Sequence, residues 1–287
     1  MEFFLPPRQI SKIKSYPLAY RRQGQGPPLI FLHGHRADTE KWWAMIARAA
    51  EDFTVYAPEL PGMNPYSPPL RGEETHLEDY ADLIAAWIEK MQLKKPLLLG
   101  VSFGGLVALI LSRKKPQLIR GQVLFWTPLS GKFFHDPRLS PRLRAIIHQL
   151  ARGGLLFHLW RFFVASPLLY FFLRRDIPPQ EFKPTIIKHE LAQWRGVDLL
   201  SWARTLDEIL RFDLPPSLTI ISPTLLVLSP QDRYFDYQKT MKLARQVFST
   251  LEIITINQPG HVPKGILPSS FVLPYEKVFA KIKNWPH

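Results

Sequence analysis

The chain has 287 residues, of which 46% are hydrophobic, so it is long enough for one or two domains with a large core. It contains no cysteine, which excludes disulfide bonds, cysteine nucleophiles and cysteine-ligated metals. The formal net charge is +13, but lysine and arginine are spread along the chain without a nucleic-acid motif, so a basic surface is favoured and no nucleic-acid partner is expected. The first residues lack a basic segment followed by a long apolar stretch, and we therefore expect no signal peptide and a cytoplasmic location.

The first part of the chain alternates between short apolar runs and amphipathic segments. Apolar runs predict strands at residues 16–23, 29–32 and 53–57. Helical spacing predicts a helix over 39–51 and a second over 77–91, in which apolar residues recur every three or four positions. A wholly apolar strand at 97–99 leads through a glycine-rich turn into a helix that is apolar on nearly every side, and a further strand follows at 121–126.

The last part of the chain repeats this alternation. It contains a predicted strand at 223–229, a helix over 237–248, a strand at 251–256, a turn at 259–261 and a closing helix over 269–285. Strands that alternate with helices predict parallel β-α-β units. The sequence therefore predicts an α/β fold with a doubly wound, mostly parallel sheet.

Residues 130–216 interrupt the alternation, because this segment is helical by pattern, rich in aromatic residues and bounded by prolines. We interpret it as a helical cap inserted into a core made of residues 1–129 and 217–287. By hydropathy, residues 154–173 resemble a membrane span. His158, Arg161 and Pro167 interrupt that stretch, so we favour a helical segment that does not cross a membrane.

The apolar stretch 155–173 of the cap has two interpretations. A helix here places Leu155, Leu159, Phe162 and Phe163 on one face, with Arg161 pointing elsewhere. Four arginines precede the stretch, namely Arg138, Arg142, Arg144 and Arg152. A basic flank beside an apolar face suits weak contact with an anionic membrane surface, or a lipid-like substrate. The alternative is that this face simply packs down on the core. We also hypothesise that the cap is a mobile lid over an apolar pocket.

A G-x-S-x-G pattern lies between the predicted strand at 97–99 and the helix that follows it. It comprises Gly100-Val101-Ser102-Phe103-Gly104. This pattern places a serine on a strained strand-to-helix turn, where glycines on either side leave room for the backbone. The Phe103 amide and the helix N-terminus then face any negative charge that forms beside Ser102.

Polar residues that can act with this serine also follow predicted strands. His33, Asp232 and His261 lie just beyond strand ends, as Ser102 does. Because the carboxyl ends of parallel strands meet at one edge of a sheet, we expect these side chains to lie close together. A serine hydroxyl is a weak nucleophile without a base, and His261 is the best candidate to accept its proton. Asp232 and Asp236 are both candidates to orient His261.

Four motifs in order resemble the α/β-hydrolase superfamily, and the resemblance covers nearly the whole chain. They are residues 20–34, 100–105, 223–232 and 260–261, in the family order of nucleophile, acid and histidine. The resemblance implies a triad of Ser102, Asp232 and His261, with Asp232 preferred over Asp236. It also implies an oxyanion hole made by the backbone amides of His35 and Phe103. The His33-Gly34 pair resembles the family loop that supports this hole.

The resemblance implies a serine hydrolase that cleaves a carboxylic ester through an acyl-serine intermediate, with no cofactor and no metal. The expected substrate is a small apolar or aromatic ester-like molecule held under the cap. Two alternatives remain, a slow or non-catalytic ligand-binding receptor and a carbon–carbon bond hydrolase or lactonase. Ser102 occupies the position where dehalogenases and epoxide hydrolases of this fold carry aspartate, which disfavours both. Val101 stands where many esterases have histidine, so no particular esterase subfamily is indicated.

Overall fold

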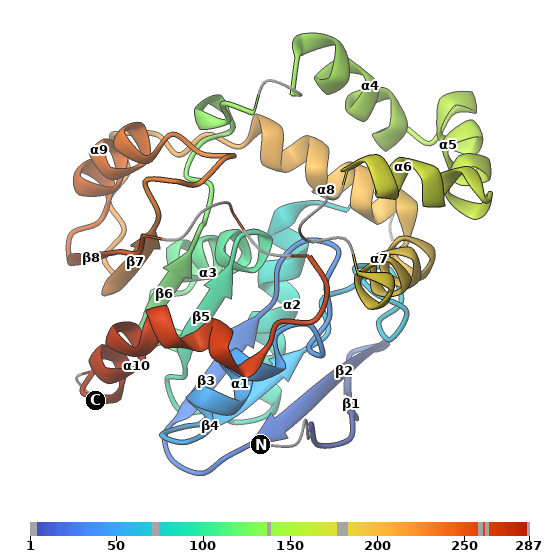
Figure 1. The fold of residues 1–287 in the computed structure, drawn as a ribbon. Helices are drawn as coiled ribbons and strands as arrows, with labels where there is room; N and C mark the ends of the chain where they lie inside the picture. Colours follow the sequence, from blue (N-terminus) through green and yellow to red (C-terminus); the bar gives the residue numbers. More distant parts are fainter. Residues whose placement is uncertain are drawn as a thin grey trace.

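A single sheet of eight strands organises the computed structural model, which describes residues 5–70, 75–136, 139–176, 183–257, 261 and 264–285 (Figure 1). The strands are β1 (Gln9–Ile13), β2 (Tyr16–Gln23), β3 (Pro28–Leu32), β4 (Thr54–Pro58), β5 (Leu97–Val101), β6 (Gly121–Phe125), β7 (Thr224–Leu228) and β8 (Leu251–Thr255). They run in the order β1-β2-β4-β3-β5-β6-β7-β8. Strands β3 to β8 pair in parallel, and β1 and β2 form an antiparallel edge. The predicted α/β fold with a mostly parallel sheet is confirmed.

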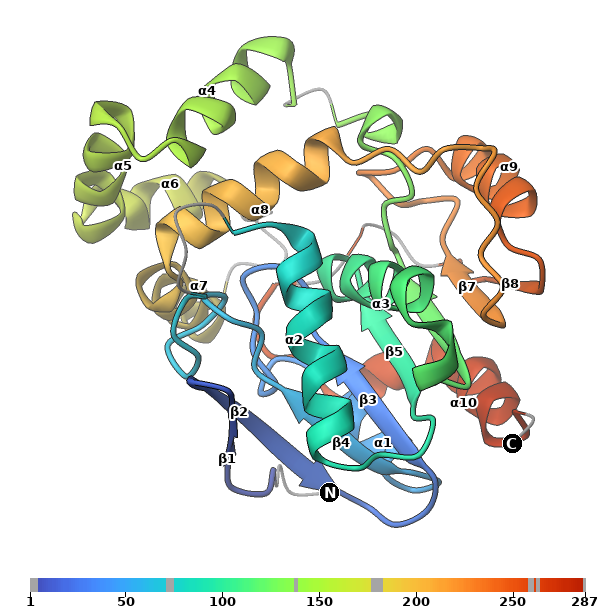
Figure 2. The same ribbon diagram turned by 180° about the vertical axis from the view of Figure 1, so that it is seen from behind.

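Helices cover both faces of the sheet (Figures 1 and 2). One face is covered by α2 (Leu77–Lys90), α3 (Phe103–Lys114) and α9 (Tyr237–Val247), and the other by α1 (Trp43–Ala49), the 3-10 helix η4 (Ser269–Tyr275) and α10 (Glu276–Lys283). Every residue of the central strand β5 is buried. Leu98 packs toward α2 and α3, whereas Leu97 and Leu99 pack toward α1 and α10. Burial on both faces explains why this strand is a continuous apolar run.

Between β6 and β7 the described residues form five α-helices, which lie beyond the carboxyl ends of the parallel strands (Figures 1 and 2). They are α4 (Pro141–Ala151), α5 (Leu155–Ala165), α6 (Leu168–Asp176), α7 (Pro184–Gly196) and α8 (Leu199–Arg211). The predicted helical insertion is confirmed, and its boundaries at 130 and 216 stay a prediction. Within the described ranges no single helix is long and apolar enough to cross a membrane. Taken together, α5 and the part of α6 up to Arg175 have sufficient length and apolar composition, but they are bent by 84°.

The structure differs from the sequence-based elements in three places. Strand β1 was not predicted, because its exposed edge position leaves only two of its five residues buried. The strand predicted to include Trp126 ends at Phe125, since the backbone of Trp126 turns to a φ of 45°. The closing helix begins as η4, which contains Pro274 and therefore lacks one backbone donor. The turn residues 259–260 and Arg138 lie outside the described residues.

The doubly covered position of β5 leads to a stability prediction. Leu98 is 0% exposed, so Leu98→Ala removes buried apolar surface and leaves a cavity between the sheet and α3. We expect the free energy of unfolding to fall by about 2–5 kcal/mol. Leu273→Ala is the matched control, since Leu273 is 67% exposed and little should change. Chemical denaturation of both variants measures the difference, and equal losses would contradict the packing described here.

Candidate active site

Ser102 lies on the sharp turn between β5 and α3, with φ 50° and ψ −110°. Its amide donates to the carbonyl of Phe125 at 2.8 Å, which holds the turn against the next strand. A Cβ atom on Gly104 would lie 2.2 Å from the carbonyl oxygen of Leu32, so only glycine lets α3 approach β3 this closely. A non-glycine residue at positive φ is strained and persists only where the surroundings hold it. The glycine pattern seen in the sequence thus places Ser102 at the carboxyl end of β5.

Asp232 and His261 are in direct contact. His261 Nδ1 lies 2.7 Å from Asp232 Oδ2, while Asp232 Oδ1 accepts from the amides of Tyr234 at 2.8 Å and Phe235 at 3.2 Å. These bonds fix the carboxylate, which is 7% exposed. A carboxylate on Nδ1 favours the tautomer with its proton there and leaves Nε2 able to accept a proton. The rings of Trp126, Tyr234 and Phe235 surround the imidazole at centroid distances of 6.0, 5.2 and 5.2 Å.

Asp236, the other candidate acid, has a different set of contacts. It is the N-cap of α9, where its carboxylate accepts from the Lys239 amide at 3.0 Å and pairs with Lys239 Nζ at 3.1 Å. The backbone hydrogen bond from Lys239 lowers the pKa of Asp236, although burial partly opposes it. Of the two aspartates, Asp232 is therefore the one that contacts His261, and the contacts of Asp236 stabilise a helix.

The loop after β3 lies beside Ser102, because a Cβ atom on Gly34 would be 3.9 Å from that of Ser102. His33 fixes this loop through two hydrogen bonds. It is completely buried, and its Nε2 accepts from the Leu60 amide at 2.9 Å. The other ring nitrogen, Nδ1, therefore carries the hydrogen and donates to the Gly34 carbonyl at 2.9 Å. Burial lowers the pKa of His33, which keeps the ring neutral and this pattern of bonds intact.

The side chain of His35 points to the cap helix α8. Its Nε2 lies 2.7 Å from Thr205 Oγ1, and the Thr205 hydroxyl donates to the Ser201 carbonyl at 2.7 Å. Thr205 is therefore the acceptor and His35 the donor. Burial, together with the charge of Arg36, lowers the pKa of His35 to about 3. The imidazole thus stays neutral and anchors the loop to α8.

Three further contacts join this loop to α7. Arg36 Nη2 lies 3.0 Å from Glu190 Oε2, and the Arg36 guanidinium stacks 4.4 Å from the centre of the Trp194 ring. Gln193 Nε2 donates to Asp38 Oδ2 at 2.7 Å. Glu190 and Gln193 are both buried, so these bonds are shielded from water. The cap helices α7 and α8 are thus bonded directly to the loop that lies beside Ser102.

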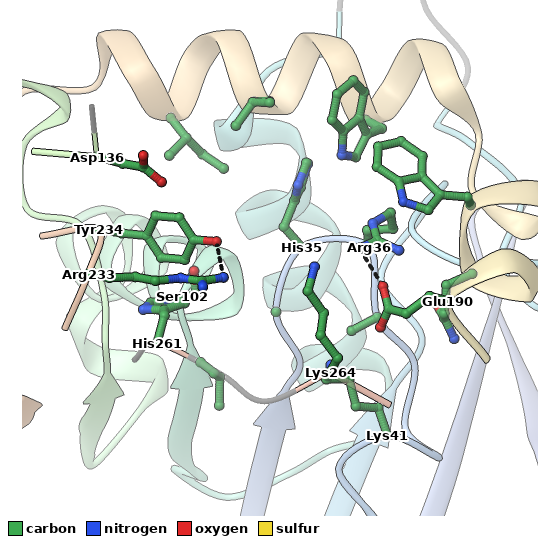
Figure 3. Close-up of a pocket in the computed structure, with 18 of the residues that line it drawn as sticks. His35, Arg36, Lys41, Ser102, Asp136, Glu190, Arg233, Tyr234, His261 and Lys264 are labelled. Carbon is green, nitrogen blue, oxygen red and sulfur yellow. Dashed lines mark hydrogen bonds and ion pairs between the residues drawn. The ribbon is translucent and has the colours of Figure 1, made fainter. Parts of the chain in front are cut away.

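A cavity of about 700 Å³ lies between these helices and the sheet, with Ser102 and His261 among the residues that line it (Figure 3). Its apolar wall comes largely from the helical insertion and comprises Phe134, Leu139, Leu143, Phe172, Trp202 and Ile209. The volume suits a small organic molecule, and its mixture of apolar walls with a few polar groups is typical of a ligand site. The predicted site residues that follow β5, β7 and β8, and those in the loop after β3, therefore line one cavity or contact residues that line it.

The far end of the cavity carries a cluster of charged side chains that sequence reasoning missed. Arg36, Lys41 and Lys264 surround Glu190 (Figure 3). Burial lowers the pKa of Lys41 to about 8, with the charges of Arg36 and Lys264 adding to the effect and that of Glu190 opposing it. Burial alone would raise the pKa of Glu190, but a hydrogen bond with His189 and the three cations lower it overall. The only sequence signal was the position of Arg36 next to His35.

Comparisons with known sequences match the same regions. A family model described as "Alpha/beta hydrolase family" covers residues 29–263. The pimeloyl-[acyl-carrier protein] methyl ester esterase of Aeromonas hydrophila is 26% identical over 261 residues, which are 89% of this chain and 96% of that protein. The protein of the same description from Vibrio parahaemolyticus is 35% identical over 102 residues, covering 36% of this chain and 37% of its own.

Solved structures give the same fold. A thermophilic esterase from Thermogutta terrifontis aligns with a TM-score of 0.67 at 20% identity, covering 98% of each chain. The epoxide hydrolase CorEH aligns with a TM-score of 0.69 at 20% identity, covering 96% of this chain and 99% of its own. Because enzymes of different reactions align equally well, these likenesses establish the fold alone. The family match spans most of the chain and includes the loop, the serine turn and the acid and histidine positions, so the protein belongs to the α/β-hydrolase family.

Proposed function

We propose that the protein is a serine hydrolase that cleaves carboxylic esters through an acyl-Ser102 intermediate. The observation that carries the proposal is the 2.7 Å contact between Asp232 and His261 at the cavity that Ser102 also lines. A serine on a strained turn, a histidine with its Nε2 able to accept a proton and a buried carboxylate behind it are the parts of a nucleophilic triad. The esterase names of the relatives support the same class of bond.

In the proposed reaction, Ser102 Oγ attacks the ester carbonyl carbon while His261 Nε2 takes the hydroxyl proton. The carbonyl π bond breaks and its electrons move to the oxygen, giving a tetrahedral intermediate. When that intermediate collapses, the bond to the alcohol oxygen breaks and His261 returns the proton to the departing alkoxide. Water then repeats both steps on the acyl-serine and releases the acid. Asp232 keeps the imidazole oriented and stabilises its positive charge in each half-reaction.

The negative oxygen of the intermediate needs donors that are already in place. The amides of His35 and Phe103 are the proposed donors, since the first follows Gly34 beside Ser102 and the second opens α3. The N-terminus of α3 adds its partial positive charge. Each such donor typically lowers the barrier by about 3 kcal/mol. The bond from His35 to Thr205 holds the first of these amides still, because it fixes the loop to α8.

The cavity favours an ester with an apolar body and an anionic group. Its walls near α8 are aromatic and aliphatic, which suits an apolar or aromatic chain. At the opposite end, Arg36, Lys41 and Lys264 lie close enough that their charges influence the pKa values of Lys41 and Glu190. Glu190 and Asp38 offset part of this charge, and the three cations still outnumber the two carboxylates, so a bound carboxylate or phosphate would be attracted there. We therefore expect esters that carry such a group to be preferred over neutral esters of equal length.

The first prediction concerns the nucleophile. An organophosphonate ester should react with the protein in a ratio of about one to one, and mass spectrometry should locate the adduct on the peptide that contains Ser102. Ser102→Ala should abolish both the labelling and the hydrolysis of p-nitrophenyl esters. Labelling that survives the substitution unchanged would overturn the assignment. Stoichiometric binding of esters without turnover by the wild-type protein would instead favour a receptor.

A second prediction separates the two aspartates. Asp232→Asn should lower kcat by about a thousandfold or more, because the amide no longer favours the productive tautomer of His261. Asp236→Asn is the matched control: asparagine caps a helix as well as aspartate does, so activity should hardly change. Steady-state kinetics on both variants, with thermal unfolding to confirm that each is folded, measures the contrast. The reverse ranking would show that Asp236 is the acid.

A third prediction tests the charged end of the cavity. For a p-nitrophenyl half-ester of a dicarboxylic acid, Lys264→Met should raise KM by roughly tenfold, because one of the three cations near the substrate carboxylate is lost. For the neutral ester of equal chain length, KM and kcat should hardly change. Lys264→Arg retains the charge and should keep most of the preference. An equal effect of Lys264→Met on both esters would show that this end of the cavity does not select for charge.

A further inference from the structure

The outward sides of α5 and α6 carry an unusual number of exposed large apolar residues. We call this surface the cap face and define it by Leu155, Leu159 and Phe162 of α5 and Leu168 and Phe171 of α6. Leu155 is 78% exposed, Phe162 76% and Phe171 62%. Large exposed apolar side chains gathered on two contacting helices mark a site of interaction with a protein, a ligand or a membrane.

The exposed side chains of the cap face do not form the contacts that pack these helices within the protein. The opposite sides of the same helices are already packed, since Phe157, Val164, Leu169 and Leu173 are buried against other cap helices. Figures 1 and 2 both place α5 and α6 at the outer edge of the molecule, away from the sheet. The alternative that the apolar face packs down on the catalytic domain is therefore wrong for Leu155, Leu159 and Phe162. Phe163 is partly buried, but it packs against other residues of the cap.

The charges around the cap face indicate what covers it. Residues 137–175 contain seven arginines and no aspartate, glutamate or lysine. Arg142, Arg152, Arg161 and Arg175 are exposed, whereas Arg144 donates to the backbone carbonyls of Gly131, Leu139 and Leu210. Arginine side chains beside an apolar surface reach anionic lipid headgroups while the apolar groups enter the acyl region. Asp136 and Asp176 flank this range, so its seven arginines outnumber the carboxylates beside them, and the segment is complementary to a negatively charged bilayer.

The shape of the two helices fits a bilayer surface better than a span. They are joined at an 84° bend, and each packs one apolar side within the cap and exposes another. A helix that is buried in protein on one side and apolar on the other lies in the plane of the interface. We propose that the cap face docks on an anionic lipid bilayer, with α5 and α6 lying at the headgroup level.

Docking would place the cavity next to the lipid. Phe172 and Arg175 of α6 line the cavity that contains Ser102. Helix α6 therefore contributes both to the cap face and to the cavity wall. An amphiphilic ester in the bilayer would meet this wall first. This consequence rests on the proposed function, whereas the docking itself does not. Binding is therefore measured without reference to hydrolysis, on the wild-type protein and on Ser102→Ala in parallel.

The experiment is co-sedimentation with vesicles of phosphatidylcholine alone and of phosphatidylcholine mixed with phosphatidylglycerol, at low and at high salt. We expect binding to the anionic vesicles to be roughly tenfold tighter or more, and to weaken as salt screens the arginines. The double variant Leu159→Gln, Phe162→Gln should lose about tenfold or more of this affinity. Its matched control is Ile221→Gln, Leu273→Gln, at two apolar residues that are 63% and 67% exposed outside the cap. The control should bind as the wild type does.

Two further measurements make each outcome decisive. The double variant should unfold at the same temperature as the wild type, because both residues are exposed. It should also hydrolyse a soluble short-chain ester at the wild-type rate, because neither residue lines the cavity that contains Ser102. Absence of binding to anionic vesicles at low salt, or equal loss in the control variant, would overturn the proposal. Sedimentation velocity tests the other occupant: a wild-type oligomer that the cap-face substitutions dissociate would show that a second copy covers this surface instead. If the proposed hydrolase function is wrong, the wild type and Ser102→Ala should still both bind the vesicles. Loss of hydrolysis and loss of docking are therefore distinguishable.

Discussion

The close approach of α3 to strand β3 is the constraint on which the rest of the site depends. A Cβ atom on Gly104 would lie 2.2 Å from the Leu32 carbonyl oxygen, and one on Gly105 would lie 1.9 Å from Thr127 Oγ1. Without side chains at these positions, the helix can begin directly at the end of β5 and hold Ser102 at a φ of 50°. The strain in that turn is sustained by a fully buried central strand. The serine hydroxyl, the helix N-terminus and the loop after β3 consequently meet at one edge of the sheet.

The cap completes this arrangement because it is bonded to the loop beside the serine. His35 reaches Thr205 on α8, Arg36 reaches Glu190 on α7, and Asp38 accepts from Gln193, also on α7. These helices therefore hold the proposed oxyanion donor in place and form the roof of the cavity. The helices α5 and α6 make their buried contacts within the cap and carry the exposed apolar surface. Helices α7 and α8 thus hold the loop beside the serine, whereas α6 both lines the cavity and, with α5, carries the outward apolar surface.

Local patterns in the sequence predicted every strand except β1, together with the candidate triad, because each depends on neighbours a few positions away. Apolar runs mark β3, β5, β6 and β7, and the polar residues of the candidate site follow the ends of such strands. The cluster of Arg36, Lys41, Glu190 and Lys264 could not be predicted this way, since it combines residues from three separate segments: the loop after β3, helix α7 and the segment after β8. Hydropathy also does not distinguish the buried side of α5 from its exposed side. The outward position of Phe162 follows only from how the cap helices pack on one another.

The most direct test of the account is an experimental structure of the protein after reaction with an alkyl phosphonate. The account predicts that the phosphorus is bonded to Ser102 Oγ and that the phosphonyl oxygen accepts from the amides of His35 and Phe103. It also predicts that the alkyl chain lies among the apolar side chains beneath α8, with His261 still bonded to Asp232. A phosphonyl oxygen that turns away from both amides, or an adduct on another residue, would contradict the account.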